Sequence, residues 1–265
     1  MAFKAHFLNV GLAGCTIFEM DNDLVMIDCG YRRTGTGVSK PTDILNYLNK
    51  TIGKTYIDLM IISHPHHDHY LGIEDLVGKA TVAKLWGSPY ERRRGDNSLA
   101  ADEWNEYSKL IEKLVPDASK RFTATKGATE KYSGCTFQIL GPRKDVNSSD
   151  TRECHDASLV VWVGAPANNF IVCGDASDSE LDLVRADWKL ADCHVLKASH
   201  HGSINGANLD FIKAVEPRDT IISTKSGIID NIPHSTALQR YKDHSTNVFR
   251  TDVSGTCTTP LKKTS

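Results

Sequence analysis

The sequence has no long hydrophobic run. Of its 265 residues 40% are hydrophobic, yet no segment approaches the roughly 20 consecutive apolar residues that a membrane-spanning helix needs. Residues 1–6 also lack the apolar core of a secretory signal peptide. We therefore expect a chain without membrane contact, in the cytoplasm.

Cysteine pairs at the spacing of metal or redox sites are also missing. The cysteines are odd in number and none forms a Cys-x-x-Cys motif, which favours reduced thiols over a disulfide framework. They are Cys15, Cys29, Cys135, Cys154, Cys173, Cys193 and Cys257. Excess positive charge is absent too, because 31 Lys and Arg oppose 33 Asp and Glu, giving a net charge of −2. Any polyanion would have to be held by a local patch or by metal ions.

No internal repeat, low-complexity linker or composition break divides the chain, so we predict one domain over residues 1–265. Short apolar segments of strand composition alternate with segments of helical periodicity, which indicates an α/β (α+β) protein. One predicted helix opens at Ser98 and carries Ile111 and Leu114 on its apolar face.

Directly after the apolar segment 56–62 the chain reads His-x-His-x-Asp-His. A buried strand followed by a tight loop turns successive side chains toward one point, so we expect His64 and His66 to converge on one ion. Asp68 and His69 then point toward a second position. Imidazole and carboxylate suit zinc, manganese or iron better than calcium or magnesium. The alternative is a polar loop that only caps a strand end, which four ligands at this spacing argue against.

Three later strand boundaries carry residues that bind metals. His155 precedes one apolar strand and Asp175 ends the next, while His200 and His201 follow a third. A carboxylate can bridge two cations through its two oxygens. The alternative for Asp175 is a plain helix-capping role, although Ser177 already fills that role.

Strands that alternate with helices bring such ends to one sheet edge. Two ions roughly 3.5–4 Å apart would share a water and lower its pKa from about 16 toward neutrality, giving hydroxide at physiological pH. The ions would also offset charge in the transition state. This chemistry serves the hydrolysis of esters, amides or phosphodiesters.

Two further features each have a functional and a structural interpretation. Asp28 ends a buried strand, where it either orients a metal-bound histidine or initiates a turn. Arg92, Arg93 and Arg94 follow the metal motif closely enough to bind phosphates, but short basic runs are often only solvated.

The His-x-His-x-Asp-His motif resembles the signature of the metallo-β-lactamase superfamily, whose fold is a four-layered αββα sandwich with a one- or two-metal site at one sheet edge. Lys-x-Ser-His-His-Gly-Ser at 197–203, Asn-x-Pro-His-Ser at 231–235 and Phe-Arg-Thr-Asp at 249–252 resemble one branch, the hydrolase domain of ComEC-type competence proteins. So do Phe-Leu-Asn-Val-Gly at 7–11 and Ile-Asp-x-Gly at 27–30. The resemblance implies a free-standing, soluble, metal-dependent phosphodiesterase or nuclease acting on nucleic acid or a nucleotide.

The same resemblance implies a role for each matching residue. The first ion would be held by His64, His66 and His155, and the second by Asp68, His69 and His201, with Asp175 bridging. Asp68 and His200 would take part in catalysis, His200 by facing the substrate phosphate. His234 would assist, or would alternatively be a neighbour of a helix cap. Lys197 and Ser203 would contact the substrate.

The chain also departs from that branch. Residues 9–15 lack the two carboxylates and the glutamine of its usual Asp-Val-Gly-Gln-Gly-Asp opening, which leaves the substrate open. The membrane channel of the uptake proteins is absent, so DNA import is not inherited. We expect two divalent ions, Zn²⁺ or alternatively Mn²⁺. Competing functions are hydrolysis of a carboxylic ester, lactone, thioester or β-lactam, and a metal-stabilised regulatory module. A redox di-iron role is disfavoured, because such relatives place Glu where this chain has His66.

Overall fold

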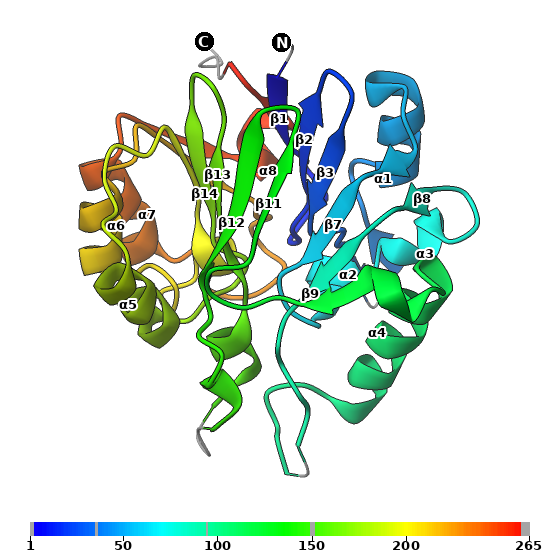
Figure 1. The fold of residues 1–265 in the computed structure, drawn as a ribbon. Coiled ribbons are helices and arrows are strands. Elements are labelled where there is room, and N and C mark those ends of the chain that lie inside the picture. Colours follow the sequence, from blue (N-terminus) through cyan, green and yellow to red (C-terminus); the bar gives the residue numbers. More distant parts are fainter. Residues whose placement is uncertain (1–2, 35–36, 94, 149–151, 261–265) are drawn as a thin grey trace.

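The computed structural model describes residues 3–34, 37–93, 95–148 and 152–260. Within these ranges, two seven-stranded sheets lie face to face (Figure 1). The first has the order β10 (Arg121–Thr123), β9 (Leu85–Gly87), β7 (Leu59–Ile62), β3 (Leu24–Ile27), β2 (Thr16–Met20), β1 (Phe3–Phe7), β18 (Cys257–Thr258). The second has the order β11 (Thr129–Tyr132), β12 (Cys135–Gly141), β13 (Val160–Gly164), β14 (Asn169–Val172), β15 (Val195–Lys197), β16 (Asp219–Ile222), β17 (Asn247–Arg250). Two smaller pairs join β4 (Arg32–Thr34) to β5 (Gly37–Ser39) and β6 (Tyr56–Ile57) to β8 (Thr81–Val82).

Helices cover the outer face of each sheet (Figure 1). The first sheet is covered by α1 (Ile44–Tyr47), which continues as a π-helical turn over Leu48–Ile52, α2 (His67–Tyr70), α3 (Ile73–Leu76) and α4 (Ala101–Leu114). The second is covered by α5 (Asp178–Asp187), α6 (Leu209–Val215) and α7 (Ser235–His244), and α8 (Thr251–Ser254) follows β17. In the described ranges, no helix has both the length and the apolar composition that crossing a bilayer requires.

Side-chain alternation along the strands separates three apolar layers. Between the sheets, Phe18 lies edge-on to Phe137 and Phe170, with ring centroids 5.5 and 5.4 Å apart. The residue before Phe18 in β2, Ile17, points to the opposite face and packs under the helices of the first sheet. Leu196 packs in the same way under the helices of the second sheet. Two inner sheets with helices outside confirm the predicted four-layered αββα sandwich.

Parallel pairing decides where the strand ends lie. In the first sheet β3, β7 and β9 run parallel, and in the second β14, β15, β16 and β17 do so. The carboxyl ends of parallel strands meet at one edge of a sheet. Asp28 follows β3, the metal motif follows β7, Asp175 follows β14, and His200 follows β15.

Two local predictions were wrong in detail. The end of the metal motif is a turn of helix, α2, rather than an open loop. The helix that we expected to open at Ser98 has Ala100 at its N-cap. Ser98 is instead bonded away from the helix, because its hydroxyl donates to Asp96 Oδ1 at 2.6 Å and accepts from the backbone N–H of Cys154 at 2.9 Å. Because the Ser98 hydroxyl is bonded to Asp96 and Cys154, it is not available to cap the helix.

Glu180 is buried in the first turn of α5, with 2% of its surface exposed. Its Oε1 atom has no hydrogen-bond partner among the residues that the structure describes. Burial, with a smaller contribution from Asp156, raises the pKa of Glu180 to about 8. The carboxyl group is therefore mostly protonated at neutral pH in the folded chain.

Wild type should become less stable as pH rises, and we expect Glu180→Gln to abolish this pH dependence. The pKa is about 8 in the folded chain against 4.5 for the ordinary group, so the folded state binds the extra proton and wild type loses stability between these values. Above pH 8 the variant should be more stable by on the order of 2–4 kcal/mol. Urea unfolding at several pH values measures this, with Glu112→Gln, a 66% exposed side chain, as the control. Parallel pH profiles for the Glu180 variant and wild type would contradict the prediction.

Candidate metal centre

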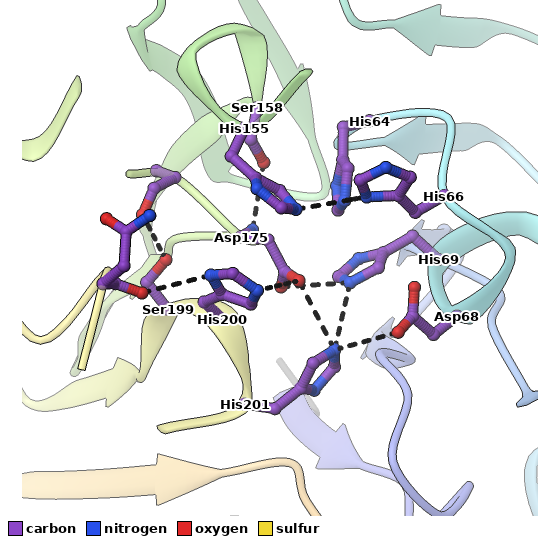
Figure 2. A network of polar contacts seen from close by, with 12 residues as sticks. His64, His66, Asp68, His69, His155, Ser158, Asp175, Ser199, His200 and His201 are labelled. Carbon is purple, nitrogen blue, oxygen red and sulfur yellow. Dashed lines mark hydrogen bonds and ion pairs between the residues drawn. The ribbon is translucent and has the colours of Figure 1, made fainter. Parts of the chain in front are cut away.

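Imidazoles and carboxylates from four strand ends meet at the edge described above (Figure 2). The first group joins His64, His66 and His155. The Nδ1 atom of His66 lies 3.0 Å from His64 Nε2 and 3.1 Å from His155 Nε2. His66 Nε2–H donates to the carbonyl of Ser98 at 2.9 Å, so its Nδ1 lone pair faces the other two rings.

The second group joins Asp68, His69 and His201. The Nε2 atoms of His69 and His201 lie 3.3 Å apart, and His201 Nε2 lies 3.8 Å from Asp68 Oδ2. His201 Nδ1–H donates to the carbonyl of Ser223 at 2.7 Å, which leaves its Nε2 lone pair pointing into the group. Both histidines are buried.

Asp175 lies between the two groups (Figure 2). Its Oδ1 atom is 3.0 Å from His69 Nε2, and its Oδ2 atom is 3.6 Å from His201 Nε2. The backbone N–H of Asp175 donates to the Ser158 hydroxyl at 3.0 Å. The preceding Gly174 has φ +51°, and a Cβ there would lie 2.5 Å from that hydroxyl oxygen, so only glycine fits. The carboxylate is thus fixed from its backbone.

Asp28 lies behind the second group. Its Oδ2 atom accepts from His69 Nδ1–H at 2.7 Å, and its Oδ1 atom accepts from the backbone N–H of Ser63 at 2.7 Å. The backbone of Asp28 is left-handed, with φ +59°. This contact sets the His69 ring so that Nε2 faces Asp175 and His201, which is the geometry that an orienting carboxylate requires.

The donor set fits divalent cations. In the second group the other ring nitrogens of His69 and His201 are taken by outside acceptors, so their Nε2 lone pairs converge with carboxylate oxygens when the rings are neutral. Acceptors at 3.0–3.8 Å from one another repel unless a positive charge lies among them. Imidazole nitrogen and carboxylate oxygen are ligands of zinc and of similar transition metals.

The charge balance without a metal follows from the same contacts. Burial alone would lower the pKa of His69, but the carboxylates of Asp175 and Asp28 raise it to about 10. Burial and the neighbouring His69 hold the pKa of His64 well below its usual value. Burial, together with His200, lowers the pKa of His155 to about 3. A proton on His69 therefore stands in for the missing positive charge.

His200 forms a further candidate ligand group with His155 and Asp175. Its ring is 4.4 Å from that of His155 between centroids, and its Nε2 atom is 3.9 Å from Asp175 Oδ2. Its Nδ1–H donates to the carbonyl of Asn205 at 3.1 Å. His200 and His201 both have left-handed backbone, with φ +49° and +54°, so the chain turns sharply enough to direct successive rings into one site.

A cavity of about 420 Å³ opens over these groups. Besides the ligand candidates, it is lined by residues that sequence reasoning missed: Leu12, Arg32, His67, Glu103, Ile229 and Ile232. Arg32 Nη1 donates to Asp68 Oδ2 at 2.9 Å. Arg32 follows the strand that ends at Asp28, so its place near the sheet edge had a weak sequence signal. Ile229 lies just before the 231–235 motif, whose resemblance to the competence-protein branch was a weak signal for this loop.

Other predicted residues are not brought to this cavity. His234 is the N-cap of α7, where its Nδ1 accepts from the backbone N–H of Thr236 at 3.1 Å. Lys197 is 1% exposed, because alternation along β15 places it on the inner face with Val195. Ser203 ends the His200 turn, its N–H donating to the His200 carbonyl.

The basic run also lies away from the described lining of the cavity. Arg92 Nε donates to the carbonyl of Leu99 at 3.0 Å, which ties this side chain to its own loop. Arg93 does not line the cavity either, and Arg94 falls outside the described residues. The predicted substrate contacts of Arg92, Arg93, Lys197 and Ser203, and the catalytic role of His234, are therefore not supported by their positions.

Comparison with known proteins agrees with this geometry. The profile of the metallo-beta-lactamase superfamily matches residues 9–226. ComE operon protein 3 of Bacillus subtilis is 26% identical over 204 residues, which are 77% of this chain and 24% of that protein. Competence protein ComA of Neisseria gonorrhoeae is 27% identical over 225 residues, 84% of this chain and 28% of that protein. The chain thus spans about a quarter of the length of these relatives.

Solved structures show the same fold at low sequence identity. The protein YhfI of Bacillus subtilis is 13% identical with a TM-score of 0.55, covering 94% of this chain and 96% of its own. Igni18, a metallo hydrolase of Ignicoccus hospitalis, is 15% identical with a TM-score of 0.54, covering 98% and 100%. CmlA, a diiron beta-hydroxylase of Streptomyces venezuelae, is 11% identical with a TM-score of 0.57, covering 93% and 52%.

We expect Gly30→Ala to displace the metal motif. A Cβ at Gly30 would lie 1.7 Å from the Asp68 carbonyl oxygen, a backbone atom that cannot rotate away. The substitution should cost about 3 kcal/mol or more of stability and weaken metal binding. Gly78→Ala is the control, because it meets open space and bears only the left-handed cost of about 1–2 kcal/mol. Equal melting temperatures and metal contents in the two variants would show that the contact does not matter.

Metal binding should release about one proton per chain at pH 7.5. His69, with a pKa of about 10 in the metal-free chain, must lose its proton before Nε2 can bind a cation. Apparent affinity should therefore rise about tenfold per pH unit up to roughly pH 10. Calorimetric titration in buffers of different ionisation enthalpy counts the protons. Asp28→Asn, which removes one of the two carboxylates that raise the pKa of His69, should reduce the number of protons released. A binding heat that is the same in all buffers would contradict the assignment.

Proposed function

The chain belongs to the metallo-beta-lactamase superfamily as a metal-dependent hydrolase, and we propose that its substrates are phosphodiesters. One observation carries the proposal: two groups of three ligands flank the Asp175 carboxylate at the floor of a cavity, and Asp175 itself groups with members of each. His64, His66 and His155 would hold one divalent ion, and Asp68, His69 and His201 the other, with Asp175 between them. We propose Zn²⁺ as the ion, with Mn²⁺ as the alternative.

Divalent ions held there would supply an activated water at neutral pH and would offset negative charge in the transition state. The protein's own residues do the remaining work. Asp28 and the Ser98 carbonyl keep His69 and His66 in the ring orientation that ligation requires. The Asp68 carboxylate, anchored by Arg32, is held at the side of the cavity where the water would lie.

His200 is placed to move a proton. Its Nδ1–H is engaged by the Asn205 carbonyl, so Nε2 is the atom that faces the cavity and exchanges a proton with substrate. The side chain is 20% exposed, which leaves it within reach of a bound ester. We assign the imidazolium form of His200, which carries a proton on Nε2 as well as on Nδ1, the protonation of the leaving oxygen as general acid, after which the neutral ring takes a proton from solvent.

The choice of phosphodiesters rests on two supports. The resemblance to the hydrolase domain of competence proteins favours a nucleotide or nucleic-acid substrate. Arg32 in the cavity wall supplies a permanent positive charge suited to a phosphate oxygen. A neutral carboxylic ester, lactone or thioester carries no negative charge in the ground state for Arg32 to bind.

We expect the purified, metal-loaded protein to hydrolyse bis-p-nitrophenyl phosphate, to lose this activity with a chelator and to recover it with zinc or manganese. His200→Ala should lower kcat about 10²–10⁴-fold while elemental analysis finds the metal content unchanged, since we assign this histidine to proton transfer. A parallel loss of metal would show instead that His200 is a ligand together with His155 and Asp175. His244→Ala, a histidine on α7 outside the cavity lining, serves as the matched control.

A substrate panel decides between the alternatives. Turnover confined to lactones, thioesters, carboxylic esters or β-lactams would reject the phosphodiester assignment. An intact biological activity in the His200→Ala protein would instead favour a metal-stabilised regulatory module.

A further inference from the structure

Charge in the cavity is sparse and mixed. Of the described residues that line it, Arg32 alone is a lysine or arginine, and it faces three carboxylates, those of Asp68, Glu103 and Asp175. Glu103 is fixed there, because its Oε1 accepts the backbone N–H of His67 at 2.6 Å. A groove that follows a nucleic-acid backbone is lined by many cations. This cavity offers one permanent positive charge besides the ions that it would hold.

Arg32 has hydrogen-bonding capacity to spare. Its Nη1 atom bonds Asp68 Oδ2 at 2.9 Å, its side chain is 35% exposed, and a guanidinium group carries five N–H donors. The same side chain can therefore anchor Asp68 and bind a phosphoryl oxygen next to it. A phosphate bound there would lie beside Asp68 of the second ligand group.

Three residues make part of the wall apolar. Leu12 is buried, Ile232 is half-buried, and Ile229 is 37% exposed although it is a large hydrophobic residue. Ile229 and Ile232 belong to one turn, in which the N–H of Ile232 donates to the Ile229 carbonyl at 3.3 Å. An apolar wall beside a cationic corner matches an ester that has an apolar or aromatic substituent next to its phosphate.

The volume of the cavity also favours a small substrate. A cavity of about 420 Å³ is at the lower end of the roughly 300–1,000 Å³ range of small-molecule sites. The other basic residues considered for phosphate binding are turned away, Arg92 toward Leu99 and Lys197 into the interior. No further phosphates of a long strand would find partners among the described residues of the cavity.

We propose that the substrate is a small phosphodiester with a single phosphate and an apolar or aromatic substituent, the phosphate bound by Arg32 and the substituent by the Ile229–Ile232 turn. The inference rests on the proposed function and narrows it, because it excludes long nucleic acid as the preferred substrate.

The first test compares substrates on the metal-loaded wild-type chain. We expect kcat/KM for bis-p-nitrophenyl phosphate to exceed that for a 20-nucleotide single strand or duplex at least 100-fold. Its KM should change less than about threefold between 50 and 200 mM salt, whereas a protein that contacts six or more phosphates loses about 10³-fold in affinity over that range. Comparable turnover of the long strands, with a steep salt dependence, would overturn this inference and leave the proposed function standing.

The second test is substitution of Arg32. Arg32→Ala should raise KM for the small diester at least tenfold, Arg32→Lys should recover part of that loss, and Arg185→Ala, an exposed arginine on α5, should change nothing. Metal content is measured in each variant, because Arg32 also contacts Asp68. If Arg32→Ala lowers kcat and metal content together at unchanged KM, Arg32 only positions Asp68 and the assignment of the phosphate contact is wrong.

The third test addresses the apolar wall. Ile229→Ala should raise KM for bis-p-nitrophenyl phosphate about tenfold with kcat nearly unchanged, since it removes contact area without touching a ligand. Leu183→Ala, a 38% exposed residue outside the cavity, is the matched control. Equal KM values for the two variants would overturn the role of the turn. Failure of the metal-loaded wild type to cleave any diester would reject the proposed function itself, and this inference with it.

Discussion

Acceptor atoms that face one another without a donor between them are the feature on which the rest of this structure depends. His69 and His201 each give one ring nitrogen to an outside acceptor, Asp28 or the Ser223 carbonyl, so their Nε2 lone pairs meet 3.3 Å apart beside the Asp175 carboxylate. Neutral rings cannot relieve that arrangement. In the metal-free chain a proton on His69 does so in part, and a divalent cation does so completely. The fold is thus built around positive charge that the side chains themselves do not supply.

Bringing these side chains together requires unfavourable backbone conformations at several positions. Asp28, Gly174, His200 and His201 all have left-handed φ values, and each lies just beyond a parallel strand of one sheet or the other. Such conformations cost about 1–2 kcal/mol for residues other than glycine. They persist because the strands before them are held by three apolar layers, which fix where each chain segment must turn. The packing of the two sheets and their helices thus offsets the unfavourable backbone conformations at the sheet edge.

Asp68 connects the candidate metal ligands to the side chain that we expect to bind the substrate. The carboxylate belongs to the second ligand group, and the Arg32 guanidinium that anchors it comes from the first residue of β4. A phosphate bound by Arg32 would therefore lie next to the ions that activate water against it. The competence-protein relatives align with this chain over only about a quarter of their own length.

By itself the sequence determined the fold class and the family, because spacing within His-x-His-x-Asp-His and the order of strands and helices are local properties of the chain. It also pointed to Asp175 and to the His200–His201 pair, since residues at the ends of parallel strands must meet at one edge. His155, which precedes the antiparallel strand β13, and the choice of His201 within its pair rested on the family resemblance. Tertiary structure alone decided which side chains reach the cavity. Lys197 looked like a substrate contact but strand alternation buried it, and His234 was taken by the cap of α7. Arg32 and Ile229 lie nearly 200 residues apart and share a wall only because two sheets stack, a relation that no local pattern encodes.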